Sequence, residues 1–307
     1  MDIFLTLIVK LIPLYAVIAL GWVAGRYLAV SKESVARLLI YVLSPAVVFH
    51  GILTIPFRPA LLLLPVIFWI VSVVLCLVFY GIGSFFWKDA RRNILAFTSG
   101  TGNTGYFGLP VAIILFGQWS VGLIVLAGFG TVLFEVSVGF FMVARGHHSV
   151  RESFIRVFRL PALYACVAGI VCNVAGLELP VAANDMFVST RGAFTVLGLM
   201  MIGLGLASAY GKRIRFDAIF TVLAFLAKFA AWPLVIFLLV VLDAQVFHLF
   251  DADTHNAIRL LAIVPLAANT VAYATELKTE PEKAATAVFL STVFALFYIP
   301  LMVAVFF

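Results

Sequence analysis

The chain has 307 residues, of which 64% are hydrophobic and 11% are charged, and its formal net charge is +6. Soluble domains contain roughly 45 to 50% apolar residues, so this composition excludes a soluble globular protein and predicts an integral membrane protein. Continuous apolar runs of about 18 residues or more predict membrane-spanning helices, because the strands of a membrane barrel alternate polar and apolar residues.

Ten apolar segments have the length of a membrane helix, which needs about 20 residues to cross the hydrocarbon. We therefore expect an all-α polytopic membrane protein with ten transmembrane helices. In chain order these spans cover residues 3–25, 34–55, 61–86, 92–117, 120–144, 159–177, 186–209, 217–242, 256–276 and 283–306.

Most of the 20 Lys and Arg residues fall in the loops after the first, third, fifth, seventh and ninth spans. Cytoplasmic loops carry an excess of basic residues, so these loops are expected in the cytoplasm and both termini outside, in the cytoplasmic membrane. The same distribution explains the positive net charge without a nucleic-acid partner.

The longest basic loop, residues 145–158, divides the chain into two sets of five spans, residues 1–144 and 159–307. Because five is odd, the second set is expected to be inserted upside down relative to the first. Short similarities occur in matching order in the two halves. Pro13-Leu14-Tyr15-Ala16 corresponds to Pro161-Ala162-Leu163-Tyr164-Ala165, and Asn103-Thr104 to Asn269-Thr270. The sequence thus predicts two inverted five-helix repeats joined by a cytoplasmic linker.

The fourth span is interrupted between Gly100 and Pro110 by glycines, a proline and a polar run. Glycine and proline each weaken a helix by about 1 to 3 kcal/mol. Backbone leaves helical geometry at membrane depth only where it is buried in protein or lines a wet cavity. A discontinuous helix is therefore expected here, with Gly102 and Gly105 as left-handed stops and Pro110 in the first turn of the next half-helix.

The ninth span has a similar interruption, which Pro265 is expected to open four residues before Asn269. At about 1.5 Å per residue, Asn103 lies about 16 Å from one surface and Asn269 about 15 Å from the other. Both asparagines are thus expected to meet at the midplane of the membrane.

Crossed half-helices present amide N–H groups at their starts and carbonyls at their ends, which suits a solute or ion site. The candidate substrate-binding residues are Asn103, Thr104, Gly105, Tyr106, Pro110, Pro265, Asn269, Thr270 and Tyr273. The alternative is that the glycines only allow close helix packing and that the asparagines bond across a helix interface.

Lys228 and Glu135 lie deep inside predicted spans, eleven and about fifteen residues from their starts. A charge at the centre of the bilayer costs on the order of 2.5 to 3.5 kcal/mol. Lys228 is a candidate to counter an anionic solute or to stabilise a helix end, and snorkelling is its alternative. Glu135 is a candidate to bind a proton or to pair with Lys228, and a structural hydrogen bond is its alternative. His50 is interpreted as a helix-end residue. No metal or cofactor pattern is present.

Four segments carry recognisable motifs, which are Leu20-Gly21-Trp22-Val23-Ala24-Gly25-Arg26, Tyr41-Val42-Leu43-Ser44-Pro45-Ala46-Val47-Val48-Phe49, the Gly102–Pro110 break and Pro265-Leu266-Ala267-Ala268-Asn269-Thr270. These motifs are similar to those of the auxin efflux carrier family. This resemblance implies the bile acid sodium symporter-like fold, with a scaffold part and a transport part that cross at broken helices four and nine. It also implies that Asn103 and Asn269 contact the substrate. Pro110 departs from the family pattern, because it lies seven residues beyond Asn103.

The broken helices favour a secondary transporter that moves a small organic anion by alternating access. The resemblance implies a mono- or dicarboxylate or an auxin-like compound as the solute, and coupling to protons or to sodium stays open. An intramembrane enzyme is the alternative, but no zinc-protease, nucleophile-elbow or phosphate-loop motif is present. A channel is the third hypothesis, and the sequence has no obvious filter or charge ring. A homodimer through the scaffold helices is expected by analogy.

Overall fold

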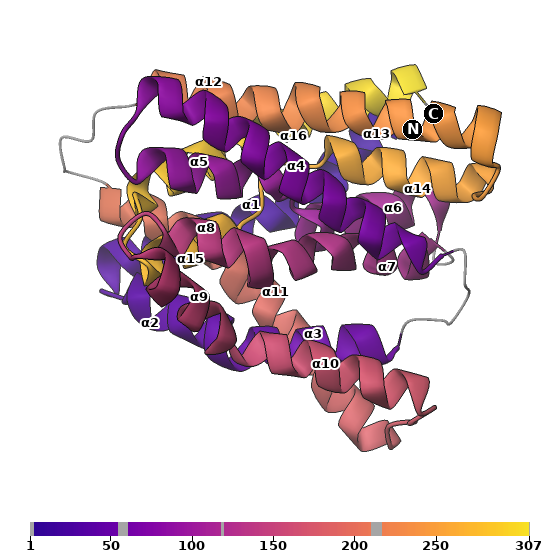
Figure 1. The fold of residues 1–307 in the computed structure, drawn as a ribbon, viewed down its shortest axis with the longest axis horizontal. Helices are drawn as coiled ribbons and strands as arrows, with labels where there is room; N and C mark the ends of the chain where they lie inside the picture. The colour runs from indigo at the N-terminus through magenta and orange to yellow at the C-terminus, as the bar shows by residue number, and fades with distance from the viewer. Residues whose placement is uncertain (1–2, 55–60, 118–119, 210–216, 307) are drawn as a thin grey trace.

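The computed structural model of the protein describes residues 3–54, 61–117, 120–209 and 217–306. These residues fold into helices without any strand (Figure 1). In chain order, and including the π-helical turns η1 to η5, the helices are α1 (Ile3–Tyr27), α2 (Lys32–Arg37), η1 (Leu38–Leu43), α3 (Ser44–Leu53), α4 (Leu63–Phe86), α5 (Arg91–Gly100), η2 (Thr104–Gly108), α6 (Leu109–Phe116), α7 (Ser120–Phe134), η3 (Glu135–Gly139), α8 (Phe140–Ala144), α9 (Val150–Phe158), α10 (Pro161–Val174), α11 (Val181–Ala209), α12 (Ala218–Leu226), η4 (Ala227–Ala231), α13 (Trp232–Leu242), η5 (Asp243–Phe247), α14 (Ala252–Ile263), α15 (Asn269–Glu276) and α16 (Pro281–Phe306).

Several of these helices are long and apolar enough to cross a membrane. Within the described residues there are 6 of them, or up to 7 if the bent pair α9 and α10 counts as one span. The fourth and ninth predicted spans fall outside this set because their breaks leave helices of 8 to 12 residues. The all-helical membrane fold is therefore confirmed, whereas the ten-span arrangement stays a prediction.

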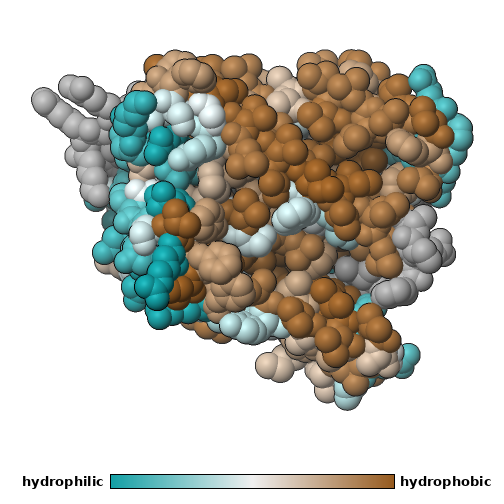
Figure 2. Space-filling model, in the orientation of Figure 1, coloured by the Kyte–Doolittle hydropathy of each residue, from teal (hydrophilic) through white to brown (hydrophobic). Residues whose placement is uncertain are grey.

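The helix α4 illustrates how the surface suits a bilayer. Val66, Ile70 and Val74 are exposed at a spacing of four residues along it, while Phe68 and Leu75 are buried on the opposite side. Residues four apart lie on one face of a helix, so an unbroken apolar stripe faces outward. Figure 2 shows that such residues form a broad hydrophobic surface between the more polar ends of the molecule. Lipid covers this surface without the cost that water would impose.

The helices pack as two groups. The panel comprises α1, α2, η1, α3, α10 and α11, in which α1 packs along α11 and α10 packs along α3. The bundle comprises α4 to α8 and α12 to α16, in which α4 packs against both α5 and α7. In Figure 1 the panel helices α2, α3, α10 and α11 lie below the bundle helices α4, α12 and α16.

The helices α1 and α11 approach each other most closely at two glycines. A Cβ atom added to Gly203 would overlap the backbone of α1 at Ile18 and Trp22, and one added to Gly21 would overlap the backbone of Met200. Side-chain-free positions therefore bring the two backbones into direct contact. This small-residue packing is a common way for helices to associate in membranes, where apolar surface alone does not drive them together.

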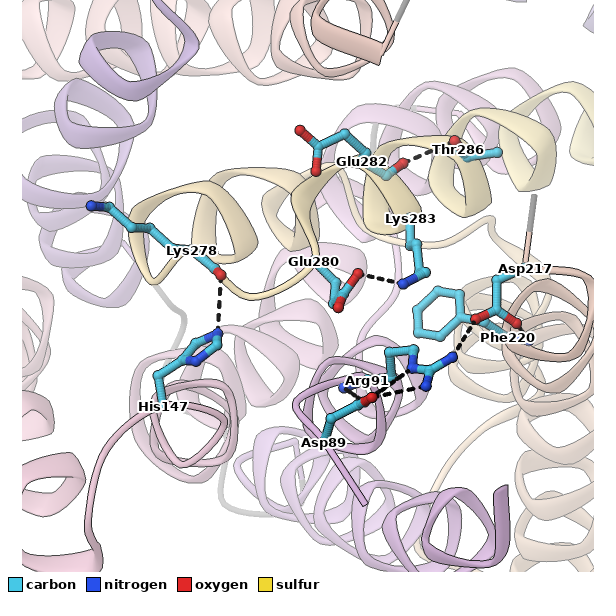
Figure 3. A network of polar contacts seen from close by, with 10 residues as sticks. All are labelled: Asp89, Arg91, His147, Asp217, Phe220, Lys278, Glu280, Glu282, Lys283 and Thr286. Carbon is cyan, nitrogen blue, oxygen red and sulfur yellow. Dashed lines mark hydrogen bonds and ion pairs between the residues drawn. The ribbon is translucent and has the colours of Figure 1, made fainter. Parts of the chain in front are cut away.

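One end of the molecule, called the basic end here, carries polar residues from loops of both halves of the chain. Figure 3 shows Arg91 between Asp89 and Asp217, with N···O distances of 2.8 and 3.4 Å. The Arg91 guanidinium hydrogen-bonds the Asp89 carboxylate and so holds the pKa of Asp89 below its usual range. His147 Nε2 donates to the carbonyl of Lys278 at 3.0 Å, which joins the loop after α8 to the loop after α15.

The predicted linker, residues 145–158, contains the helix α9. Ser149 caps it, accepting a hydrogen bond from the Glu152 amide at 3.2 Å, while the Glu152 carboxylate accepts one from the Ser149 amide at 2.9 Å. This capping box satisfies two amides that the first turn leaves without helical partners. The chain then bends by 48° into α10, so the connection between bundle and panel is a short ordered helix.

Asp217 is expected to stabilise the protein through the start of α12. Its carboxylate accepts the Phe220 amide at 3.1 Å and also pairs with Arg91. Because a lost N-cap costs about 1 kcal/mol, the Asp217→Ala variant should lower the free energy of unfolding in detergent micelles by about that amount. Asp217→Asn keeps the cap and loses the ion pair, and should recover most of the loss. Equal destabilisation by both variants would show that the ion pair dominates.

Candidate functional site

The first break separates α5 from α6. Helix α5 ends at Gly100, and Thr101 has an extended conformation with φ −113° and ψ 167°. Pro110 lies in the first turn of α6, as predicted. Among the described glycines only Gly117 and Gly176 have positive φ, so the prediction of left-handed stops at Gly102 and Gly105 is wrong. Extended backbone at Thr101, which any residue can adopt, ends the helix instead.

Packing around α5 explains why it ends there. The indole Nε1 of Trp232 donates to the carbonyl of Ser99 at 2.8 Å, which occupies an acceptor that the helix end leaves without a helical partner. A Cβ atom added to Gly100 would lie 2.5 Å from the Phe134 ring and 2.7 Å from the Ser72 carbonyl oxygen. Glycine is therefore needed at this position for close packing.

The second break separates α14 from α15. Helix α14 ends at Ile263, and Val264 has φ −67° and ψ 156°. This extended conformation is the one favoured for a residue that precedes proline, since the proline ring clashes with helical geometry there. Pro265 therefore opens the break, as predicted, and α15 begins at Asn269.

The two breaks contact each other through main-chain atoms. The amide of Asn103 donates to the carbonyl of Pro265 at 2.8 Å. Side chains add to this contact, because a Cβ atom on Gly108 would lie 2.9 Å from Leu261 and 3.4 Å from Val264. The two interruptions, more than 150 residues apart in the sequence, thus form one crossing point.

A cavity of about 420 Å³ lies between the panel and the bundle at this crossing. Its bundle wall comes from the two breaks and from α7 and η3, and its panel wall from α3 and α11. The lining residues are Ser44, Val47, Val48, His50, Gly51, Gly102, Asn103, Thr104, Gly105, Leu109, Ile124, Val125, Gly128, Phe129, Thr131, Val132, Glu135, Val136, Val188, Arg191, Gly192, Phe194, Thr195, Ala267, Ala268 and Asn269. The cavity combines a mostly apolar lining with a few polar groups, as small-molecule sites commonly do.

Glu135 and Asn269 meet in the cavity wall. The Asn269 side-chain amide donates to Glu135 Oε2 at 2.9 Å, and the Glu135 side chain is only 4% exposed. Glu135 lies at the start of the π-helical turn η3. The hydrogen bond joins the second break to the helix formed by α7, η3 and α8. Glu135 therefore makes the structural hydrogen bond that was its alternative role, and its partner Asn269 also lines the cavity.

Lys228 is buried behind the first break and does not pair with Glu135, so the alternative of a Glu135–Lys228 ion pair is wrong. Its Nζ lies 4.4 Å from the centroid of the Trp232 ring, and a Cβ atom on Gly102 would be 2.5 Å from it. The ammonium therefore lies just beyond the end of α5. A cation at a helix C-terminus interacts favourably with the helix dipole, which fits the helix-end alternative.

The other predicted site residues separate into two sets. Thr104 and Gly105 line the cavity, and Thr104 Oγ1 would lie 3.0 Å from a Cβ atom on Gly128 of α7. Thr270 and Tyr273 lie behind the cavity wall, where Tyr273 packs against the rings of Phe97, Phe140 and their neighbours.

The remaining predictions concern backbone or undescribed side chains. Pro265 contributes its carbonyl to the crossing and does not line the cavity. The side chains of Tyr106 and Pro110 lie outside the described residues. The predicted binding set is thus brought to the cavity only in part.

Sequence reasoning missed the panel wall. His50 lies in the cavity wall, where its Nε2 is 2.9 Å from Asn184 Oδ1 and its ring stacks on Phe187, rather than serving only as a helix-end residue. Arg191 of α11 also lines the cavity. Its position inside an apolar span was a usable signal, because a charge in a membrane helix usually faces a partner or a cavity.

The described residues hold no group of three or more His, Cys, Asp or Glu side chains arranged to bind a metal ion. The polar groups that line the cavity are amides and carboxamides, hydroxyls, the His50 imidazole, the Glu135 carboxyl group and the Arg191 guanidinium. Such groups bind and orient a polar solute.

Comparison with known proteins gives similar proteins that are transporters. Residues 6–154 match the model of a family described as membrane transport protein, which confirms the resemblance to auxin efflux carriers stated from the motifs. A curated relative from Methanocaldococcus jannaschii, an uncharacterized transporter, is 23% identical over 291 residues, which cover 90% of this chain and 92% of the relative. The protein is thus an integral membrane transporter.

Trp232 is expected to be more important for stability than its burial alone indicates. The Trp232→Phe variant leaves the Ser99 carbonyl without its donor in a buried site, which costs about 1 to 3 kcal/mol of unfolding free energy. Trp69→Phe is the matched control, because Trp69 Nε1 donates at 3.3 Å to the hydroxyl of Ser137, which is itself bonded to Leu133. Chemical unfolding in micelles should show the larger loss for Trp232→Phe. Similar losses for the two variants would contradict a special role for the Ser99 bond.

Proposed function

We propose that the protein is a secondary active transporter that carries a small organic anion across the cytoplasmic membrane by alternating access. The observation that carries this proposal is the crossing of two broken helices, through the Asn103–Pro265 hydrogen bond, at the wall of a cavity. Irregular backbone at membrane depth is typical of transporter binding sites, where discontinuous helices present their ends to the solute. A continuous pore with a filter or charge ring would instead favour a channel.

The helix directions at the crossing support two inverted five-helix repeats. In Figure 1, α5 and α15 lie toward the basic end, and α6 and α14 lie toward the other end. The chain therefore enters the first break from the basic end and the second break from the opposite end. Together with the matching motifs of the two halves, this opposite entry is what ten spans in two inverted repeats require.

An anionic solute is favoured by the helix ends at the cavity. The helical segment that begins at Thr104 and the helix α15, which begins at Asn269, both start in the cavity wall. The N-terminal end of a helix carries partial positive charge and amide donors, so two such ends attract a carboxylate. Asn103 and Asn269 stand at these two starts and supply carboxamides.

The position of the cavity indicates which step of the cycle the structure represents. With basic loops in the cytoplasm and both termini outside, the basic end faces the cytoplasm. There the panel and bundle are joined, since Glu276 of α15 is 3.3 Å from Arg37 Nε and accepts from Tyr41 at 3.3 Å. Lys32 is 3.4 Å from Glu282 in the same region. We infer a state closed toward the cytoplasm, with the cavity in the other half of the molecule.

Glu135 is the proposed coupling residue for protons. Its carboxyl group lines the cavity and accepts its hydrogen bond from Asn269, a residue of the crossing. Gain or loss of a proton there changes whether the oxygen accepts or donates, and so changes how Asn269 is held. A sodium site is the second possibility, for which carboxylate and carbonyl oxygens are the fitting ligands.

The two crossing asparagines provide the direct test. A thermal-shift screen of the full-length protein against small carboxylates selects a solute, and counterflow of that labelled solute is then measured in proteoliposomes. Asn103→Ala and Asn269→Ala each remove a hydrogen bond to a charged group, so counterflow should fall about tenfold or more. Asn103→Ala keeps the main-chain bond to Pro265.

The matched control is Asn256→Ala, which removes a carboxamide of α14 that bonds Arg259 and does not line the cavity. This variant should transport at the wild-type rate. Counterflow that is unchanged in both crossing variants would remove their side chains from the site. Flux that neither saturates nor supports counterflow in the wild type would contradict a carrier.

Glu276 provides a test of the closed basic end. Glu276→Gln weakens the contact with Arg37, and exposed ion pairs contribute about 0.2 to 1 kcal/mol, which shifts a two-state population by roughly 1.4- to 5-fold. In a variant whose three cysteines are replaced by serine, Thr195→Cys should then react more slowly with an impermeant thiol reagent added outside. Asp253→Asn, a charge change on α14, is the control. A faster reaction would contradict the assignment of the state.

A further inference from the structure

Arg191 is an isolated charge in the apolar stretch of α11. It is the only charged residue between Met186 and Ala209. A guanidinium within a membrane helix costs about 2.5 to 3.5 kcal/mol on insertion scales, so its position calls for a compensating environment.

The face of α11 that carries Arg191 is turned toward the cavity. Val188, Arg191, Gly192 and Thr195 all line it, and their spacing of three, four and seven residues defines one face of a helix. A Cβ atom added to Gly192 would meet nothing within 4 Å, and the same holds for Gly105 across the cavity. The Arg191 side chain is exposed and thus has free space beside it.

No carboxylate compensates the guanidinium in the part of the chain that the structure describes. The backbone carbonyl of Arg191 accepts the Thr195 hydroxyl at 2.9 Å, but its side chain has no ion pair with a described residue. Glu135, the other charged residue among the described lining residues, is engaged by Asn269 on the bundle wall. Among the described lining residues, Arg191 is thus the one permanently charged cation, and it belongs to the panel wall.

We propose that Arg191 binds the carboxylate of the transported solute from the panel wall, opposite the carboxamides of the crossing. This inference rests on the proposed function and assigns a recognition residue within it. A guanidinium is always charged and donates two parallel hydrogen bonds to a carboxylate, a geometry that an ammonium does not reproduce. Binding between the panel and the bundle gives the solute contacts with both groups of helices that move relative to each other.

The test compares carboxylates with their neutral amides in wild type, Arg191→Gln and Arg191→Lys. The probes are succinate with succinamide and phenylacetate with phenylacetamide, assayed for counterflow in proteoliposomes. We expect Arg191→Gln to raise the half-saturating carboxylate concentration about tenfold or more with little change in maximal rate. Arg191→Lys should give an intermediate value. Arg259→Gln, which removes a guanidinium outside the cavity lining, should resemble the wild type.

The outcomes separate the two proposals. If wild type and Arg191→Gln exchange a carboxylate with equal half-saturation, the role of Arg191 is wrong while the carrier function stands. If the wild type exchanges neither probe acid nor any carboxylate from the screen, the proposed function fails, and the inference fails with it. A fall in maximal rate alone, with half-saturation unchanged, would assign Arg191 a structural role and overturn the inference.

A lipid phosphate is the other source of an anion for Arg191, and the vesicle composition distinguishes it. The assay is repeated in vesicles of phosphatidylcholine alone and with added phosphatidylglycerol. A solute-binding role predicts the same Arg191→Gln defect in both, specific to acids over amides. A defect that appears only with the anionic lipid and is equal for acids and amides would overturn the inference.

Discussion

The structure depends on one constraint, which is that polar backbone inside a membrane must find partners within the protein. Two helices are interrupted, and each interruption exposes amides and carbonyls. The hydrogen bond from the Asn103 amide to the Pro265 carbonyl pairs a donor of the first break with an acceptor of the second. Each break therefore contributes a hydrogen-bonding partner that the other needs.

The glycine, proline and asparagine signals located both breaks in the sequence. Proline allowed the outcome to be predicted where local geometry decides it, since Val264 is extended before Pro265 and Pro110 starts α6. Glycine did not. Gly100 is required because the Phe134 ring and the Ser72 carbonyl lie against it, and such contacts come from distant segments. The expected left-handed stops at Gly102 and Gly105 failed because extended backbone at Thr101 ends α5 before either glycine.

The sequence located residues of the bundle wall of the cavity, whereas on the panel wall only Arg191 carried a usable signal. Asn103 and Asn269 belong to conspicuous polar runs, whereas Ser44, His50 and Arg191 stand singly in apolar helices. The packing of whole helices decides which face of such a helix meets a cavity, and the local sequence pattern does not contain this information. Glu135 and Lys228 show the same limit. Each lies in a π-helical turn, and their partners, Asn269 for Glu135 and the Trp232 ring for Lys228, come from packing that a local pattern does not reveal.

The close approach of α1 and α11 has a mechanical consequence. At Gly21 and Gly203 no layer of side chains separates the two backbones, so neither helix can slide along the other without collision. Packed elements normally accommodate shear through small rotamer changes in an intervening side-chain layer. The crossing of α1 and α11 has no such side-chain layer, so relative sliding of these two helices is restricted there. In the alternating-access cycle that we propose, α1 and α11 would therefore move together as one unit.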